Sequence, residues 1–345
     1  MRNLIIILLG ILPEVLVAQN LGRNANLDSL DSYIAKQNFY DLRKEEKIHS
    51  VEKQIAENQR DNQKLYLLLG DLYNEYQSYI YDSAYVCAEK LLGIANSLND
   101  NDKIVEAKVK IGFCYLSAGL YKEAFDILEN ISVKNCTVPT KIEFFICKSR
   151  LYYDLADYNR GKNFIEKYNA EGNVLLDSAL NILPKNSAKY WATMALLQMK
   201  SENFQQAIDA FERLINQKES SQHDIAIATS SIAYILTLQG KKPDAQNYLV
   251  RAAIADIQSS VKETVALRNL AQLLYENGDI EHATIYVRKA LQDAMFYNAR
   301  QRQLEIGAIL PIIEGERIKN IENQRKKMIF VSIGVGLLAL ILLVA

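Results

Sequence analysis

Large and small apolar positions recur along the middle of the chain at intervals of about forty residues. In the three clearest segments a large apolar residue precedes a small one, and tyrosine or leucine follows three positions after the small residue. A glycine stands seven positions after it and an alanine twelve positions after it. The small residues are Gly112, Ala233 and Ala271. This spacing predicts helical hairpins, because small residues let two helices approach closely and glycine ends the first helix.

Three further segments fit the pattern less closely. Their small residues are Gly70, Ser149 and Ala195, and Glu202 occupies the position after Ala195 where the pattern has glycine. The six units, over residues 63–296, resemble the tetratricopeptide repeat (TPR), a helix–turn–helix unit that stacks into a superhelix. The resemblance implies an all-α fold, a TPR-like solenoid of helical hairpins.

The segment before the repeats, residues 19–62, has a helical and mostly polar pattern. Narrow apolar stripes run through Leu30 and Ile34, and through Ile48, Val51 and Ile55. We expect helices that bury one narrow face each.

The chain begins with one basic residue, a short apolar run and a small residue before polar sequence. This outline is typical of a secretory signal, and we expect residues 1–18 to be a signal peptide cleaved after Ala18. The alternative is a buried hydrophobic helix at the start of the fold.

The chain ends with residues 328–345, which contain no charged side chain. A run of this length and composition predicts a transmembrane helix. Residues 297–327 continue as a membrane-proximal helix toward it. We expect a kink or break at Leu310-Pro311, because proline removes a helical hydrogen bond.

The basic residues Arg325, Lys326 and Lys327 stand just before this span. Basic residues beside a span favour the cytoplasmic side, whereas a signal peptide would place them outside. Two explanations remain. Either a more basic cytoplasmic segment follows Ala345 in a longer chain, which we favour, or the protein is cytoplasmic and tail-anchored.

Composition narrows the class of protein. The 345 residues carry a net charge of −1, which gives no electrostatic reason to expect nucleic-acid binding in this region. The scarcity of glycine (14) and proline (5) disfavours a turn-rich β fold. Four cysteines are too few for a disulfide scaffold, and we expect buried thiols, with a native disulfide as the alternative.

Motifs for catalysis or for metal binding are missing from the sequence. The three histidines, His49, His223 and His282, lie far apart, and no Cys-x-x-Cys pair is present. No glycine-rich phosphate loop follows a predicted strand. We therefore predict a protein that is not an enzyme in this region and has no cofactor or metal.

Two motifs extend the resemblance beyond the repeat. Tyr81-Asp82-Ser83-Ala84 opens a repeat helix, and Ile309-Leu310-Pro311-Ile312-Ile313-Glu314 precedes the span. Together with the exported start, the irregular repeats and one span, they are similar to Gram-negative membrane-bound regulators with a periplasmic TPR sensor. This resemblance implies an inner-membrane, single-pass protein with most of its chain in the periplasm. In that family a cytoplasmic coiled coil and a DNA-binding output follow the span, some members respond to oligosaccharides, and related architectures carry a histidine kinase instead.

A binding site is expected on the concave face, which the first helices of the repeats form. Positions at fixed offsets from the small residues select eight candidates: Asp71, Asn74, Arg150, Tyr153, Tyr234, Arg268, Gln272 and Tyr275. Tyrosine and arginine offer stacking surfaces and hydrogen bonds, which suit a protein, peptide or oligosaccharide ligand. Any one of these residues can instead be an ordinary solvated or inter-repeat position. Two other functions stay open: a membrane-anchored scaffold for protein complexes, and the sensor part of a histidine kinase.

Overall fold

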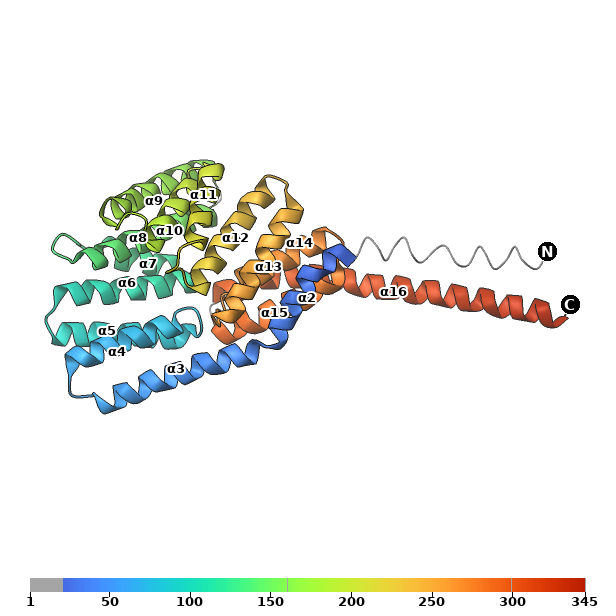
Figure 1. Ribbon diagram of the computed structural model, residues 1–345, viewed down its shortest axis with the longest axis horizontal. Coiled ribbons are helices and arrows are strands. Elements are labelled where there is room, and N and C mark those ends of the chain that lie inside the picture. The colour runs from blue at the N-terminus through green and yellow to red at the C-terminus, as the bar shows by residue number, and fades with distance from the viewer. Residues whose placement is uncertain (1–20, 160, 299, 345) are drawn as a thin grey trace.

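The computed structural model describes residues 21–159, 161–298 and 300–344, and the predicted signal peptide at residues 1–18 lies outside them. The described part contains fifteen helices and no strand (Figure 1). The predicted all-α solenoid of helical hairpins is confirmed.

Six helical hairpins follow one another along the chain, each packed against the next (Figure 1). Their helices are α4 (Asn62–Tyr76) with α5 (Tyr81–Ser97), α6 (Asn101–Ala118) with α7 (Tyr121–Glu129), α8 (Val138–Asn159) with α9 (Lys162–Ile182), α10 (Ala188–Lys200) with α11 (Phe204–Ile215), α12 (Gln222–Leu238) with α13 (Lys242–Gln258), and α14 (Val265–Glu276) with α15 (Ile280–Tyr297).

The small residues of the repeat pattern are the points where the paired helices approach each other. Ser149, Ala195, Ala233 and Ala271 are fully buried. At Gly112 an added Cβ would lie 2.8 Å from Cδ2 of Leu128 on the partner helix. The hairpin geometry therefore depends on the absence of a side chain at this position.

In four of the six hairpins the turn between the two helices has the same conformation. Gly119, Gly240 and Gly278 have φ of 78°, 74° and 84°, the left-handed region that ends many helices. Glu202 adopts the same conformation, with φ of 60°, in the hairpin where the sequence lacks glycine. The backbone bond that closes these turns also has the same form: N–H of Asn203 donates to Gln198 as that of Lys241 donates to Leu236, both at 2.9 Å. At Glu202 the packing of the two helices imposes the left-handed conformation, which a glutamate does not itself favour.

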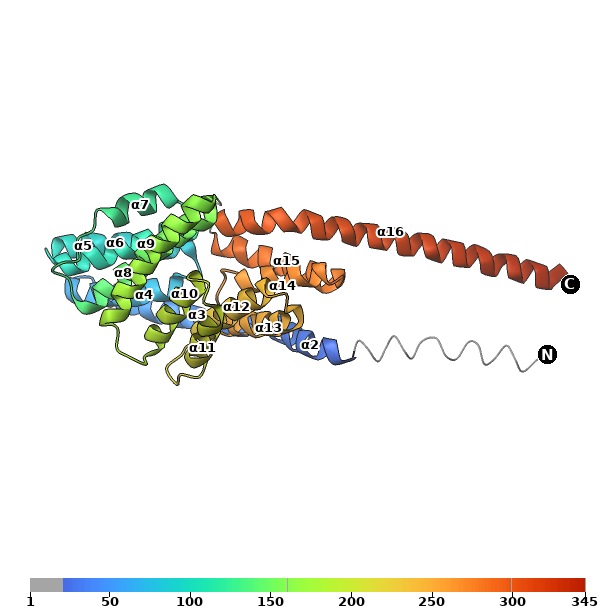
Figure 2. The ribbon, with the colours of Figure 1, turned by 90° about the horizontal axis from the view of Figure 1, so that it is seen from above.

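Two helices precede the repeats, α2 (Leu21–Ala35) and α3 (Gln37–Glu57). Leu30 of α2 is buried in the same core as α13, and Ile48 of α3 is buried against α4 and α5. The N-terminal segment thus reaches both the first hairpin and the later ones, which are far away in sequence (Figures 1 and 2).

The last hairpin returns to the first, so the superhelix closes on itself. The hydroxyl of Tyr297 donates to the carbonyl of Gln77 at 2.9 Å, and the backbone N–H of Lys262 donates to the carbonyl of Ser78 at 2.8 Å. Asn298 donates to the Asp82 carboxylate at 2.7 Å. We call these contacts, between the 77–82 segment and residues 262, 297 and 298, the closure seam.

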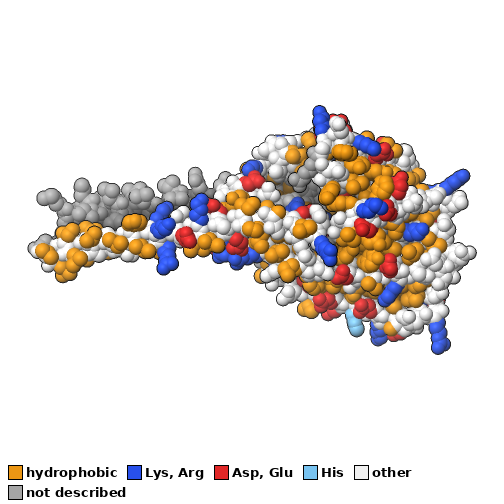
Figure 3. Space-filling view, turned by 180° about the vertical axis from the view of Figure 1, so that it is seen from behind, with side chains coloured by type: hydrophobic (Ala, Val, Ile, Leu, Met, Phe, Trp, Pro, Cys, Tyr) orange, Lys and Arg blue, Asp and Glu red, His pale blue; other side chains and the backbone are white. Residues whose placement is uncertain are grey.

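A single long helix, α16 (Arg300–Val344), ends the described chain and projects from the solenoid (Figures 1 and 2). Its first part packs on α15 through Ile306 and Ile313, which are both buried. Apolar side chains surround its far end (Figure 3). Among the described helices, α16 is the one long and apolar enough to cross a membrane.

Two details of the sequence prediction concern this helix. The helix continues without a break through Pro311, with Ile306 and Ile313 packed on the core on either side of the proline, while a kink within the continuous helix stays a prediction. In the structure Tyr297 is the last residue of α15, Asn298 caps this helix with φ of 65°, and α16 begins at Arg300. The predicted segments 297–327 and 328–345 are otherwise parts of one continuous helix.

Candidate ligand-binding cavity between the first helices

A cavity of about 540 Å³ lies between the first helices of the hairpins. Its wall comes from α4, the α4–α5 turn, α6, α8, α10 and one residue of α12, Ile227. Apolar and aromatic side chains form much of this wall, and charged side chains converge on it from neighbouring helices. This combination of an apolar body with a few placed polar groups is typical of small-ligand sites.

Three basic side chains of the wall each lie over an aromatic ring of the preceding first helix. The pairs are Lys110 with Tyr73 at 5.0 Å, Arg150 with Phe113 at 4.6 Å, and Lys200 with Tyr153 at 5.0 Å. Such cation–π contacts hold the long basic side chains along the wall instead of letting them extend into the cavity. The same contact thus repeats across three successive interfaces between hairpins.

Each of these cations also has a carboxylate neighbour. Arg150 lies 3.4 Å from Asp154, and Lys200 lies 3.2 Å from Asp157. Lys110 lies 3.7 Å from Glu143. The wall is therefore a set of internally balanced charges, in which a ligand must compete with partners already present.

The pair formed by Arg150 and Asp154 is the most enclosed of the three. Burial raises the pKa of the Asp154 carboxyl, although Arg150 opposes this shift. Burial acts to lower the pKa of Arg150, but the nearby carboxylates of Asp154 and Glu263 outweigh it, so that pKa is raised. Arg150 therefore stays charged, and Asp154 is the member of the pair whose protonation responds to its surroundings.

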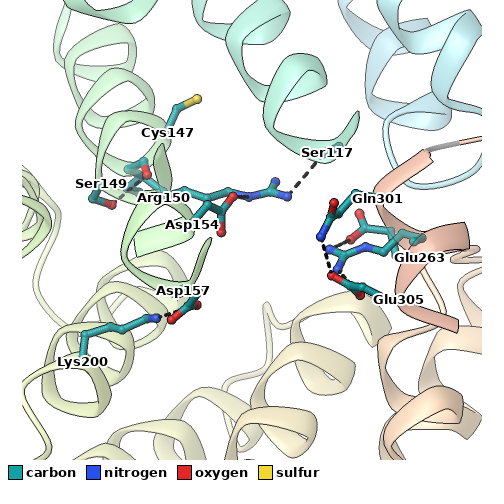
Figure 4. A network of polar contacts seen from close by, with 12 residues as sticks. Ser117, Cys147, Ser149, Arg150, Asp154, Asp157, Lys200, Glu263, Gln301 and Glu305 are labelled. Carbon is teal, nitrogen blue, oxygen red and sulfur yellow. Dashed lines mark hydrogen bonds and ion pairs between the residues drawn. The ribbon is translucent and has the colours of Figure 1, made fainter. Parts of the chain in front are cut away.

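Arg150 also faces the start of α16. Its guanidinium extends from α8 toward the Ser117 hydroxyl at 3.4 Å, in the direction of Gln301 and Glu305 (Figure 4). Arg302 of α16 pairs with Glu305 at 3.3 Å and with Glu263 at 3.7 Å. The charged rim of the cavity is thus continued by charges of the long helix.

The structure brings together three of the eight predicted site residues. Asn74, Arg150 and Tyr153 line the cavity. Tyr153 is held there by a hydrogen bond of 2.8 Å from its hydroxyl to Asn173, and its ring packs so closely on Gly172 that a Cβ there would lie 2.5 Å from it.

The other five predicted residues are not part of this cavity wall. Asp71 and Tyr234 are exposed, and Tyr275 packs against the main core. Arg268 is engaged by Glu305 of α16 at 2.6 Å, and exposed Gln272 donates to Glu276 at 3.3 Å. The offsets used in the prediction select a face of each helix, but α16 approaches that face of α14.

Sequence reasoning missed several wall residues, above all Lys110, Phe113 and Lys200. A signal for some of them was available, since aromatic residues recur at positions 73, 113 and 153 and basic residues at 110 and 150. This regular interval matches the hairpin repeat and would have indicated an inter-repeat contact on the inner face.

The four cysteines, Cys87, Cys114, Cys136 and Cys147, are free and buried, as the sequence analysis favoured. Cys147 contributes to the cavity wall, and burial raises the pKa of its thiol to about 12. Its sulfur lies 3.6 Å from the carbonyl oxygen of Val109. This environment is that of an inert structural thiol. Across residues 21–344, as far as they are described, no group of three or more His, Cys, Asp or Glu side chains is placed to hold a metal ion.

A family comparison agrees with this architecture. Residues 34–308 match the family described as the SusR N-terminal TPR domain. No curated protein sequence matches the chain. Solved structures with a similar arrangement include a thermophilic TPR protein from Thermus thermophilus, at 16% identity over 62% of this chain and 99% of that chain, with a TM-score of 0.46. Another is a tetratricopeptide repeat protein from Parabacteroides merdae, at 14% identity over 80% of this chain and 99% of that chain, with a TM-score of 0.44.

Proposed function

The chain belongs to the family of SusR N-terminal TPR domains, and we propose that it is the ligand-sensing region of a membrane-anchored regulatory protein. In this proposal it has no catalytic role, and it binds a protein, peptide or oligosaccharide in the cavity between the first helices. The bulk of the chain lies in the periplasm, and α16 crosses the inner membrane toward an output domain.

The observation that carries the proposal is the position of α16 relative to the cavity. Gln77 lines the cavity and accepts the hydrogen bond of Tyr297, three residues before Arg300, the described start of α16. Arg150 and Asp154, in another part of the wall, lie toward the Gln301 amide and the Glu305 carboxylate (Figure 4). A ligand that moves either part of the wall therefore changes contacts that hold the start of α16.

The side chains of the cavity wall indicate which class of ligand the cavity can bind. Phe113 is partly exposed and offers aromatic surface, Tyr73 and Tyr153 are buried beneath Lys110 and Lys200, and Asn74 and Gln77 offer amide groups that both donate and accept hydrogen bonds. A sugar ring or an apolar peptide side chain satisfies both. The balanced charges disfavour a highly charged ligand, because it would have to displace existing ion pairs.

Transmission in this proposal requires a change between two arrangements of the solenoid. Ligand binding favours the arrangement whose cavity fits the ligand more closely, and the hairpins reorient relative to one another. Because the hairpins close into a ring through the closure seam, this reorientation shifts the seam and the base of α16. The helix then carries the movement to the span.

The test is hydrogen exchange of residues 300–327 in the full chain, with and without a saturating ligand. Linear oligosaccharides and short apolar peptides are screened first by thermal shift, and hits are titrated by calorimetry. We expect Arg150→Met to weaken binding about tenfold or more, since it removes a wall cation that lies over Phe113. Unchanged exchange in 300–327 at saturation contradicts the sensor proposal.

A matched control is available in Arg251→Met. Arg251 also lies over a tyrosine ring, Tyr248 at 5.3 Å, but on α13 and outside the cavity. It should leave ligand affinity unchanged. If both variants lose ligand affinity equally, Arg150 affects binding only through the stability of the protein.

A second candidate function, a scaffold for protein partners, has its own structural basis. Tyr158 at the end of α8 and Phe164 at the start of α9 are exposed aromatic residues. Such surfaces occur at protein–protein contacts. A partner that binds through Phe164 without changing exchange in 300–327 would favour this function over sensing.

A further inference from the structure

A second cavity, of about 450 Å³, lies beside the closure seam, between α3 and α15. It is separate from the cavity between the first helices, and the two share none of their lining residues. The side chains that matter for its chemistry are Gln37, Asp41, Glu45, Lys262, Asp293 and Phe296.

Three of these polar side chains are almost completely buried: Gln37 is 6% exposed, Lys262 2% and Asp293 6%. Nε2 of Gln37 donates to Oδ1 of Asp293 at 3.1 Å. Because an ionised carboxylate only accepts hydrogen bonds, this contact fixes the orientation of the Gln37 amide. Its Oε1 is then an acceptor, and this buried atom has no hydrogen-bond partner among the described residues.

Asp41 presents the second unfilled acceptor. Its Oδ2 accepts from Nζ of Lys262 at 2.6 Å, while its buried Oδ1 has no partner within the described chain. Gln37 and Asp41 are four residues apart on α3, so their side chains lie on the same face of the helix. The cavity thus contains two buried acceptors on one wall that require hydrogen-bond donors.

The basic groups of the cavity do not supply these donors. Lys262 is already bound by Asp41 and lies 3.6 Å from Asp293, and Lys289 pairs with Asp293 at 2.9 Å. In the lining that the structure describes, three carboxylates, those of Asp41, Glu45 and Asp293, stand against two ammonium groups, and Glu45, which is exposed, also accepts a hydrogen bond of 3.0 Å from the hydroxyl of Tyr79. By this count of described residues, the site lacks one positive charge as well as two donors.

We propose that this cavity binds a small organic cation with a primary ammonium or guanidinium group. Both oxygens are buried, so the two side chains turn toward the cavity as the cation binds; the cation then donates to Oε1 of Gln37 and Oδ1 of Asp41 and supplies the missing charge. The ring of Phe296 already lies under Nζ of Lys262, at 5.7 Å from the ring centroid, and its exposed part adds apolar surface beside the bound cation. Because Asp41 belongs to α3 and Phe296 to α15, the bound cation stabilises the closed superhelix.

The experiment uses the full chain in detergent and titrates methylguanidinium and methylammonium by calorimetry and thermal shift. Methylurea, which has a similar shape and donors but no charge, is the matched ligand control. We expect dissociation constants of about 1–10 mM for at least one cation, as befits a ligand of few atoms, and a higher melting temperature. Methylurea should bind about tenfold more weakly or not detectably.

Asp41→Asn is the diagnostic variant. Its amide oxygen can still accept from Lys262, but an NH₂ group then replaces the unfilled acceptor, so cation affinity should fall about tenfold or more. Glu45→Gln removes one charge at the more exposed edge and should weaken binding about threefold, which keeps the test valid if Asp41→Asn does not fold. Glu46→Gln, an exposed position on the same helix, should change nothing.

Equal binding of methylurea and the cations would overturn the proposal, as would unchanged affinity in both Asp41→Asn and Glu45→Gln, or no binding of either cation. Arg150→Met should leave cation binding intact. Loss of ligand sensing at the first cavity and loss of cation binding at the second are therefore separate outcomes.

Discussion

The hydroxyl of Tyr297 donates a hydrogen bond of 2.9 Å to the backbone carbonyl of Gln77, 220 residues earlier in the chain. Tyr297 is the last residue of α15 and only 1% exposed, and Gln77 lines the cavity between the first helices. This one contact joins the wall of the cavity to the residue that ends the last hairpin. It also forms part of the closure seam that makes the solenoid a ring.

Replacing Tyr297 by phenylalanine should lower the free energy of unfolding by about 1–2 kcal/mol, because the variant removes the hydrogen bond that the side chain of this buried residue makes to Gln77. Urea unfolding followed by circular dichroism measures this change. Tyr234→Phe, at a position 53% exposed, is the control and should cost less than about 0.5 kcal/mol. If the two variants lose equal stability, the closure seam does not contribute as described.

The small residue at position 112 allows a second prediction. Gly112→Ala should destabilise the protein by about 1–3 kcal/mol, because the new Cβ would lie 2.8 Å from Leu128, which is fully buried. Gly93→Ala is the matched control, since Gly93 is an exposed residue inside α5 and no atom of the described chain lies within 4 Å of the added Cβ. It should stabilise by about 0.5–1 kcal/mol through helix propensity. If Gly112→Ala and Gly93→Ala change the stability in the same direction, the result contradicts a close approach of α6 and α7 at Gly112.

The left-handed turn residues predict opposite effects in two equivalent hairpins. Glu202→Gly should raise stability by about 1 kcal/mol, because it relieves a side chain from a conformation with φ of 60°. Gly240→Ala should lower stability by a similar amount. No described atom lies within 4 Å of a Cβ at Gly240, so the loss would be conformational and not steric. Thermal unfolding of both variants measures these changes, and a destabilised Glu202→Gly would indicate an unrecognised role for this glutamate.

Buried thiols give the protein a defined response to alkaline pH. Burial raises the pKa of Cys87 to about 11 and those of Cys114 and Cys147 to about 12, from the ordinary value of 9.0. A raised pKa favours the neutral thiol in the folded state, so this contribution to stability is complete below pH 9 and is lost as the pH rises toward 12. We expect urea midpoints to fall over this range. At a pH of about 8, a thiol reagent should label the native protein far more slowly than the unfolded one, in which all four cysteines react.

The sequence was sufficient to predict the hairpins because their determinants are local. The small residue, the apolar residue before it and the turn glycine all act within one helix pair, and the sequence alone marks Glu202 as a departure from the glycine of the pattern. The closure seam was beyond such reasoning. It joins the backbone carbonyls of Gln77 and Ser78 to Tyr297 and Lys262. Every residue has such a carbonyl, so the periodic pattern of side chains does not indicate these contacts.

The candidate cavity was predictable only in part, for a related reason. Arg150 and Tyr153 follow from the helix register within a repeat, which the sequence specifies. Which hairpins face one another depends on the curvature of the whole superhelix, a sum of small rotations between repeats. Arg268 illustrates the limit: its register is that of an inner-face residue, but Glu305 of α16 binds it.

Pro311 is an exposed residue within an unbroken helix, so Pro311→Ala should strengthen α16. Proline has no N–H to donate to the carbonyl of Gly307, and alanine restores this hydrogen bond, which together with the gain in helix propensity should stabilise the segment by about 1–3 kcal/mol. Hydrogen exchange of residues 303–318 in the full chain should slow accordingly. Gly315→Ala is the control, because it raises propensity without restoring a missing bond and should slow exchange less. If α16 transmits movement from the closure seam as a stiff rod, Pro311→Ala leaves or increases the ligand-dependent change in residues 315–327. If the helix instead bends at the proline, the same substitution abolishes that change.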